Sequence, residues 1–351
     1  MLEISDLKAW RLREPVSKRA YTVVKVQAGS LSGYGECGAA TAEQVDRAKK
    51  IALKREATAY EAIRRDLASL TGMQSAVDMA LLDITGKFAK APVYQVLGGP
   101  TRNKVRAMAM LDGSDPVASM KSAREAGYRA FSVPVPQIGA RNQGRAFVDA
   151  ANKRMEALRA AGGEDVDFVL DGGGALSPGD SGSVAAALER FHLLWFDEPC
   201  VISNLSALRK IAAETVTPLG FGRTIHAPGR FQDLLREDAI DILRPSLAQN
   251  GITQLRRMAV IAETYYVAVA PYHDGGPVMT AAALQLAAAL PNFFIQQIPA
   301  AASEQDRKMR AEIAGASLET VKDGYAALPT GPGLGITVNE EALRKYEESA
   351  G

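Results

Sequence analysis

The sequence has few of the residues that several kinds of functional site require. Its 351 residues include two cysteines, Cys37 and Cys200, and three histidines, His192, His226 and His273. Two cysteines cannot build a disulfide framework or a cysteine-based zinc site, so a reducing compartment is expected. Three histidines leave a short list of candidates for any histidine-dependent mechanism.

An excess of charge and a long hydrophobic run are also absent. Lys and Arg number 41 against 40 Asp and Glu, a net charge of +1, and the basic residues are scattered. This balance provides no broad field for nucleic acid or an anionic membrane. No apolar run reaches the roughly 18 residues of a membrane span, and the first residues carry acids where a signal peptide needs a basic and then an apolar stretch. We therefore predict a cytoplasmic protein with neither nucleic-acid nor membrane partners.

The first hundred residues indicate an α+β unit. Residues 21–34 read as a β-hairpin with Gly29 and Ser30 at its turn. Thr41 and Gln44 form a capping-box pattern that opens a polar helical stretch to about Leu70. A further helix is predicted from the apolar spacing over residues 75–94.

From residue 105 onward, short apolar runs alternate with amphipathic helical segments. The eight runs are 105–110, 130–135, 167–170, 193–196, 218–221, 240–243, 266–270 and 293–295. This alternation is typical of an α/β protein with a (β/α)8 TIM barrel. An open doubly wound sheet is the alternative that the pattern alone leaves open.

One glycine motif is misleading. Residues 33–38 match the G-x-G-x-x-G fingerprint of dinucleotide-binding proteins. That fingerprint requires a preceding strand, a helix that opens on it and a surrounding parallel βαβ unit. Here the motif ends a hairpin, so we interpret its glycines as turn residues.

Charged residues follow three consecutive predicted barrel strands. Asp171 ends the third strand, Asp197 the fourth, and Arg223 the fifth. Side chains at the carboxyl ends of neighbouring barrel strands can converge, because adjacent strands lie roughly 5 Å apart. Carboxylates placed there would suit a hard cation such as Mg²⁺.

Several segments together resemble the enolase superfamily, in its mandelate racemase and muconate lactonizing enzyme branch. They are GYGE at 33–36, AVDMALLDITGK at 76–87 with PVYQVLGG at 92–99, DEP at 197–199 with NGIT at 250–253, and PGLGITVNEE at 332–341. The resemblance implies a modified TIM barrel over residues 101–324. It also implies an α+β capping domain over residues 1–100, to which residues 325–351 return.

The resemblance further implies Mg²⁺ held by three carboxylates, and proton abstraction next to a substrate carboxylate. In the family the bases are a lysine of a K-x-K pair ending strand 2 and a histidine ending strand 7, which an aspartate on strand 6 supports. Here other residues stand at these strand ends and are predicted to bind the substrate: Ser132 and Pro134 on strand 2, Ser246 on strand 6 and Gln297 on strand 8.

At the metal position, Asp171 and Asp197 remain as predicted ligands, but Arg223 replaces the third carboxylate. A guanidinium repels a divalent cation, so we expect that Mg²⁺ is not bound with the family's geometry. Tyr272 stands where the family has its histidine, and His273 follows it. We predict that Asp171, Arg223, Tyr272 and His273 are catalytic; which of the last two faces the barrel mouth depends on the alternation of the strand.

Three functions are compatible with these residues. The protein is a metal-independent isomerase or lyase on a small carboxylate or acid sugar, a non-catalytic relative that binds a small anion, or a Mg²⁺-dependent isomerase or dehydratase with displaced ligands. In each case the expected partner is a small anionic molecule, and the resemblance implies a homo-oligomer.

Overall fold

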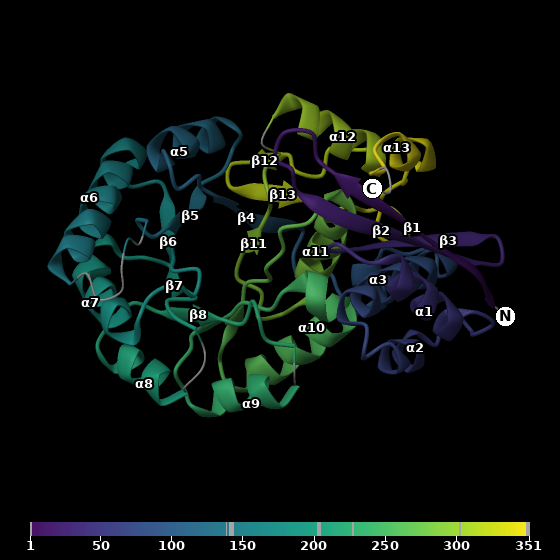
Figure 1. The fold of residues 1–351 in the computed structure, drawn as a ribbon, viewed down its shortest axis with the longest axis horizontal. Coiled ribbons are helices and arrows are strands. Elements are labelled where there is room, and N and C mark those ends of the chain that lie inside the picture. The colour runs from purple at the N-terminus through teal and green to yellow at the C-terminus, as the bar shows by residue number, and fades with distance from the viewer. Residues whose placement is uncertain are drawn as a thin grey trace.

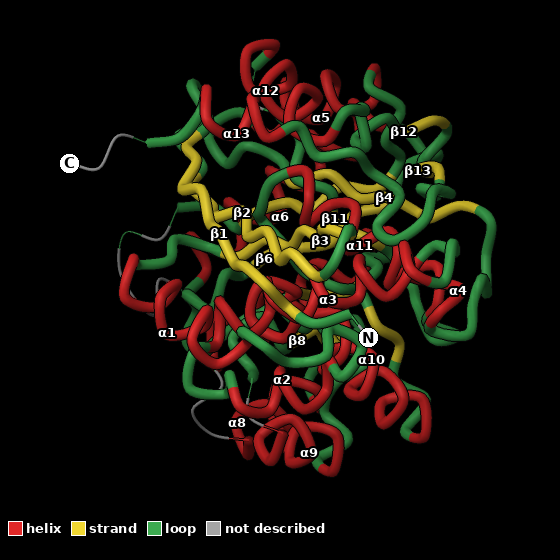
Figure 2. The backbone as a smooth tube through the Cα atoms, turned by 90° about the vertical axis from the view of Figure 1, so that its right-hand side faces the viewer, coloured by secondary structure: helices red, strands yellow, loops and turns green. Residues whose placement is uncertain are grey.

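The computed structural model describes residues 2–137, 139, 144–201, 205–226, 228–301 and 303–348. Two parts are visible in Figure 1: a capping domain in purple and blue at the right, and a ring of strands and helices at the left. Figure 2 views the molecule from the cap side, with strands β1 and β2 lying across the front of the barrel.

The cap is built on a three-stranded antiparallel sheet in the order β1-β2-β3, which are Ile4–Arg13, Ala20–Ala28 and Leu31–Cys37. The predicted hairpin is confirmed, and Gly29 at its turn has φ 55°. The additional strand β1 was not predicted from the sequence. It pairs along the whole of β2, and its buried residues are Ile4, Leu7, Trp10 and Leu12.

Four helices complete the N-terminal part of the cap: α1 (Ala42–Ala52), α2 (Tyr60–Asp66), α3 (Thr71–Phe88) and α4 (Val93–Val96). The capping box at Thr41 is confirmed. The prediction of one helical stretch to Leu70 is wrong, because the chain leaves the helix at Leu53. Lys54 adopts a left-handed φ of 63°, and the amide of Lys54 donates to Ile4 of β1.

The glycines of the G-x-G motif allow the cap sheet to approach α3. A Cβ atom at Gly33 would overlap the carbonyl oxygen of Ala80, and one at Gly35 would overlap that of Ala76. Only glycine permits this contact between backbone and backbone. A packing role therefore accounts for the motif.

The barrel has eight parallel strands, with β4 to β10 neighbouring in chain order. They are β4 (Lys104–Met110), β5 (Ala130–Pro134), β6 (Asp167–Asp171), β7 (Trp195–Asp197), β8 (Leu219–Phe221), β9 (Ile242–Leu243), β10 (Ala268–Val269) and β11 (Gln296–Gln297). Strand β11 pairs with β4 and the bridge between Val269 and Phe293 completes the circle. The barrel prediction is confirmed, but its last strand lies just after the predicted run 293–295.

The outer helices are α5 (Pro116–Glu125), α6 (Arg145–Gly162), α7 (Pro178–Leu188), α8 (Leu205–Ala213), α9 (Pro228–Arg236), α10 (Leu247–Thr264), α11 (Pro277–Ala289) and α12 (Glu304–Ala314). Strands β12 (Val321–Lys322) and β13 (Tyr325–Ala327) extend the sheet beyond β4. None of the described helices combines the length and hydrophobicity needed to cross a bilayer.

The C-terminal segment returns to the cap. Helix α13 (Glu340–Lys345) is capped by the side chain of Asn339, the residue that precedes it. Lys25 of β2 forms an ion pair with Glu340, and the amide of Glu348 donates to Arg11 of β1. The cap is therefore assembled from both ends of the chain.

Candidate functional site

The structure brings together the three charged residues that were predicted at neighbouring strand ends. Asp171 ends β6 and Asp197 ends β7, and the two residues are paired in register. Arg223 lies two residues beyond β8. Its Nη2 atom is 3.0 Å from Asp171 Oδ2 and is also bonded to Asp197 Oδ2. The guanidinium thus bridges both acids.

A second arginine, Arg244, reaches the same cluster from the end of β9. Its side chain is fully buried, and its Nε atom lies 3.1 Å and 3.2 Å from the two carboxylate oxygens of Asp197. The Arg244 guanidinium also donates to the carbonyl of Ala270 and to Gln297 Oε1. Two arginines therefore face two buried acids, and their charges balance when both acids are ionised.

Glu198 fixes the backbone from which Arg223 extends. This residue follows β7 with a left-handed φ of 42°, and its Oε1 atom accepts hydrogen bonds from the amides of Gly222 (2.7 Å) and Arg223 (2.8 Å). A buried carboxylate with two amide donors holds a loop firmly. No role had been predicted for Glu198 or Arg244. A signal was present in Arg244, because an arginine directly after an apolar strand needs a buried partner.

The two acids differ in how readily they ionise. Burial opposes the charged form of Asp197, but Arg244 and Arg223 outweigh it and lower its pKa. Burial raises the pKa of Asp171, and the charge of Asp197 acts in the same direction. Asp171 is therefore the acid of the pair that takes up a proton more easily.

Beside the cluster lies a cleft of about 500 Å³ between the cap and the barrel. The cap contributes residues 37–40, Gln44 and the start of α3, and the barrel contributes Arg223, Ser246 and Tyr272. The guanidinium carbon of Arg223 stands 4.7 Å from the ring centroid of Tyr272. Burial raises the pKa of Tyr272 to about 12, so its phenol is protonated at neutral pH.

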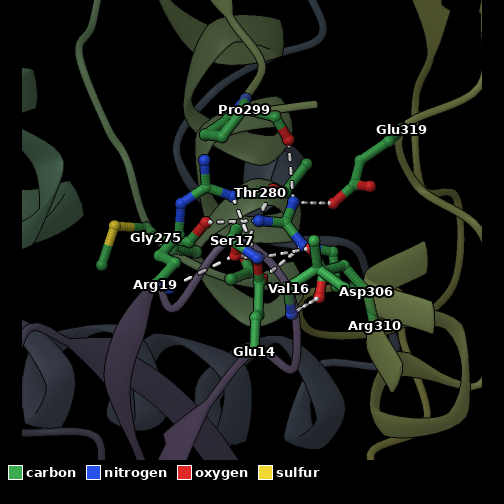
Figure 3. Close-up of polar contacts among 12 residues, drawn as sticks. Glu14, Val16, Ser17, Arg19, Gly275, Thr280, Pro299, Asp306, Arg310 and Glu319 are labelled. Carbon is green, nitrogen blue, oxygen red and sulfur yellow. Dashed lines mark hydrogen bonds and ion pairs between the residues drawn. The ribbon is translucent and has the colours of Figure 1, made fainter. Parts of the chain in front are cut away.

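His273 lies away from this cleft. Its side chain is fully buried, and neither ring nitrogen has a hydrogen-bond partner among the described residues. Burial lowers the pKa of His273 to about 3, and Arg310 and Arg19 add to the effect. Arg310 itself donates hydrogen bonds to Glu14, Glu319 and the carbonyl of Pro299 (Figure 3). The imidazole is neutral, and its placement does not support the predicted catalytic role.

The residues predicted to bind substrate are spread around the barrel mouth. Ser132 is fully buried with a hydroxyl that has no partner among the described residues, and Pro134 ends the same strand, β5. Ser246 lines the cleft at the start of α10. Gln297 joins the charged cluster through Arg244, and its Nε2 atom is buried without a partner in the described part of the chain.

The residues at the metal position do not fit Mg²⁺. A magnesium site needs several oxygen ligands around an open centre, whereas Arg223 occupies the space between Asp171 and Asp197. Within the described ranges, no group of three or more His, Cys, Asp or Glu side chains is arranged to hold a metal ion. A guanidinium supplies the positive charge at this position instead.

Comparison with known proteins gives matches along nearly the whole chain. Residues 9–98 match the family model of the mandelate racemase / muconate lactonizing enzyme N-terminal domain, and residues 115–342 match that of the enolase C-terminal domain-like family. A D-galactonate dehydratase from Ralstonia nicotianae is 31% identical over 280 residues, which are 78% of this chain and 73% of that protein.

Solved structures have the same fold. A mandelate racemase/muconate lactonizing enzyme-like protein from Rubrobacter xylanophilus is similar with a TM-score of 0.89 and 25% identity, over 99% of this chain and 98% of that one. Another protein of that description, from Roseovarius sp. TM1035, has a TM-score of 0.88 at 23% identity, over 99% and 96% of the two chains.

Proposed function

Because the chain belongs to the enolase superfamily, in its mandelate racemase/muconate lactonizing enzyme branch, and carries Arg223 at the metal position, we propose that it binds a small acid sugar without Mg²⁺. The ligand would occupy the cleft between cap and barrel, with its carboxylate held by Arg223. The observation that carries the proposal is the Arg223 guanidinium, which bridges Asp171 and Asp197 and borders the cleft.

Arg223 retains donor capacity for an anion. Its Nη2 atom serves the two acids, and its Nη1 atom forms no hydrogen bond within the described part of the chain. A planar guanidinium offers several N–H groups in a fork that matches a carboxylate. The exposed Gln44 and the hydroxyl of Ser246 border the same cleft and supply polar contacts for a hydroxylated ligand.

The acid-sugar class is supported by the relative from Ralstonia nicotianae, whose name specifies D-galactonate. Galactonate carries one carboxylate and a chain of hydroxyl groups. The cleft is lined by Arg223, by one acid, Asp274, and by uncharged polar side chains. This lining suits that combination, because the cation orients the carboxylate and the other polar groups meet the hydroxyls.

Dehydration of the bound acid sugar is a second candidate, favoured by two groups that lie close to the Arg223 guanidinium. Asp171 has a raised pKa and would accept the proton from the carbon next to the carboxylate. Tyr272 is protonated and would donate to the departing hydroxyl, which leaves as water. The positive charge of Arg223 would stabilise the enediolate.

Titration calorimetry with D-galactonate, D-gluconate and related aldonates, in the presence of EDTA and again with Mg²⁺, tests the proposal. We expect at least one aldonate to bind with an affinity that Mg²⁺ leaves unchanged. Arg223→Gln should weaken this affinity by about tenfold or more, since a charge-assisted contact is lost. The matched control is Arg236→Ala on α9, whose ion pair is exposed.

Binding that requires Mg²⁺ would contradict the proposal, and so would full affinity in Arg223→Gln. Mass spectrometry of the incubated aldonate separates the two candidates. Loss of water, abolished in Tyr272→Phe with binding retained, identifies a dehydratase. An unchanged aldonate indicates binding alone.

A further inference from the structure

A second concave site shares the lining residue Gln249 with the cleft. It has a volume of about 380 Å³ and lies where cap helices α2 and α3 meet barrel helix α10, which are neighbours in Figure 1. We call it the basic notch, because Arg64, Arg65, Arg257 and His226 line it. No acidic residue is among its lining residues in the described part of the chain.

The arginines at the basic notch outnumber the acids that pair with them. Glu61 is shared by two of them, at 3.2 Å from Arg64 and 2.7 Å from Arg257. Asp66 is shared in the same way by Arg55 and Arg65. Each carboxylate can neutralise only one guanidinium, so positive charge remains at this junction. An anionic ligand placed there would neutralise the remaining positive charge.

Two of the residues that line the notch, Gln249 and Asn250, carry buried acceptor atoms. Asn250 is buried and held by its Nδ2 atom, which donates to the carbonyl of Ser246 at 2.9 Å and to that of Ile225 at 3.3 Å. Its Oδ1 atom and the Oε1 atom of Gln249 are buried and have no partner among the described residues. Buried acceptors without donors are costly, so they mark a place for hydroxyl groups or water.

We propose that the basic notch binds a phosphate monoester of a small polyol. The dianionic phosphate would lie against Arg65 and Arg257, and the hydroxyl groups would donate to Asn250 and Gln249. The volume falls within the range of small-molecule sites. Because Gln249 also borders the cleft, an occupant of the notch is positioned to influence binding there. This site is separate from Arg223, and its test does not depend on the function of the cleft.

Calorimetry with glycerol 3-phosphate at low ionic strength tests this proposal. The double variant Arg65→Ala/Arg257→Ala removes two largely exposed side chains and leaves Glu61 paired with Arg64. We expect its affinity to fall by at least about tenfold. The control Arg145→Ala/Arg236→Ala removes two exposed, ion-paired arginines elsewhere and should change the affinity by less than about twofold.

Inorganic phosphate serves as a second probe. It supplies the dianion without the polyol, so we expect weaker binding than for glycerol 3-phosphate. Equal affinity for both probes would show that Asn250 and Gln249 do not bind the hydroxyl groups of the ligand. Full binding in Arg65→Ala/Arg257→Ala, or binding lost in Arg223→Gln alone, would place the phosphate elsewhere and overturn the proposal.

Discussion

Arg223 places a positive charge where a third metal-binding carboxylate would complete a magnesium site. Its guanidinium contacts two buried acids, Asp171 and Asp197. That Asp171 and Asp197 lie near Arg223 was predictable from their spacing, because the two acids end strands in adjacent βα units. The groups that bind the Arg223 guanidinium were not predictable, since it could have held either a ligand or these acids. The structure resolves this through distance, with Arg223 bonded to both carboxylates.

The charge at position 223 should control metal binding. In Arg223→Glu, three carboxylates would face the centre now occupied by the guanidinium, and Mg²⁺ should bind with one-to-one stoichiometry because oxygen ligands replace a repelling cation. Isothermal calorimetry with MgCl₂ measures this. Arg223→Gln is the control, since it removes the cation without adding a ligand, and should not bind tightly. A tight stoichiometric site in the unmodified protein would contradict the interpretation.

At the scale of elements, the charged cluster joins four strand ends. Asp171 ends β6, Asp197 ends β7, Arg223 follows β8 and Arg244 follows β9, so the ion pairs connect neighbouring strands at the barrel mouth. The acid at the centre is fully buried. Removing one partner from such a group leaves an uncompensated buried charge, which costs more than the pair itself contributes.

Asp197→Asn should therefore destabilise the protein strongly. We expect the free energy of unfolding to fall by about 3–5 kcal/mol, because Arg244 would be left buried without its counterion. Urea denaturation followed by circular dichroism measures the change. The control is Asp233→Asn, which breaks an exposed pair with Arg236 at 3.9 Å and should cost less than about 1 kcal/mol. Equal effects in both variants would show that the cluster is not a stabilising unit.

At the end of β10, the sequence leaves the orientation of two adjacent side chains undecided. Tyr272 and His273 are adjacent, and successive side chains of extended backbone point to opposite sides. The sequence identified the pair but not its orientation. In the folded chain Tyr272 borders the cleft, whereas His273 is buried near Arg310.

At the scale of the whole molecule, buried polar contacts fasten the cap to the barrel. Glu36 of β3 accepts hydrogen bonds from the amides of Gly276, Val278 and Met279, where α11 begins. Asp306 of α12 accepts from the amides of Val16 and Ser17, and Arg310 binds Glu14 (Figure 3). The cap loop 14–19 is thereby attached to the barrel.

This junction should make stability depend on pH. Burial raises the pKa of Glu36 from 4.5 to about 7, although amides at the start of α11 favour the charged form. The folded state then binds more protons than the unfolded state between these values, so stability from this group is present below pH 4.5 and is lost as the pH rises through about 7.

The difference in unfolding free energy between the unmodified protein and Glu36→Gln should therefore shrink by up to about 3 kcal/mol over this interval. Urea denaturation at a series of pH values measures it. The control Glu43→Gln removes an exposed acid of α1 and should give a difference that does not follow the same curve. A pH-independent difference for Glu36→Gln would contradict the raised pKa.

The sequence by itself determined the alternation of strands and helices, the cap hairpin, and the strand ends at which polar residues stand. These features follow from local periodicity and turn chemistry, which are properties of neighbouring residues. Only the tertiary structure decided that Arg244 joins Asp197, that Glu198 holds the loop before Arg223, and that His273 is buried and does not line the cleft. Each depends on contacts between residues far apart in the chain, whose distances and burial exist only once the barrel has closed.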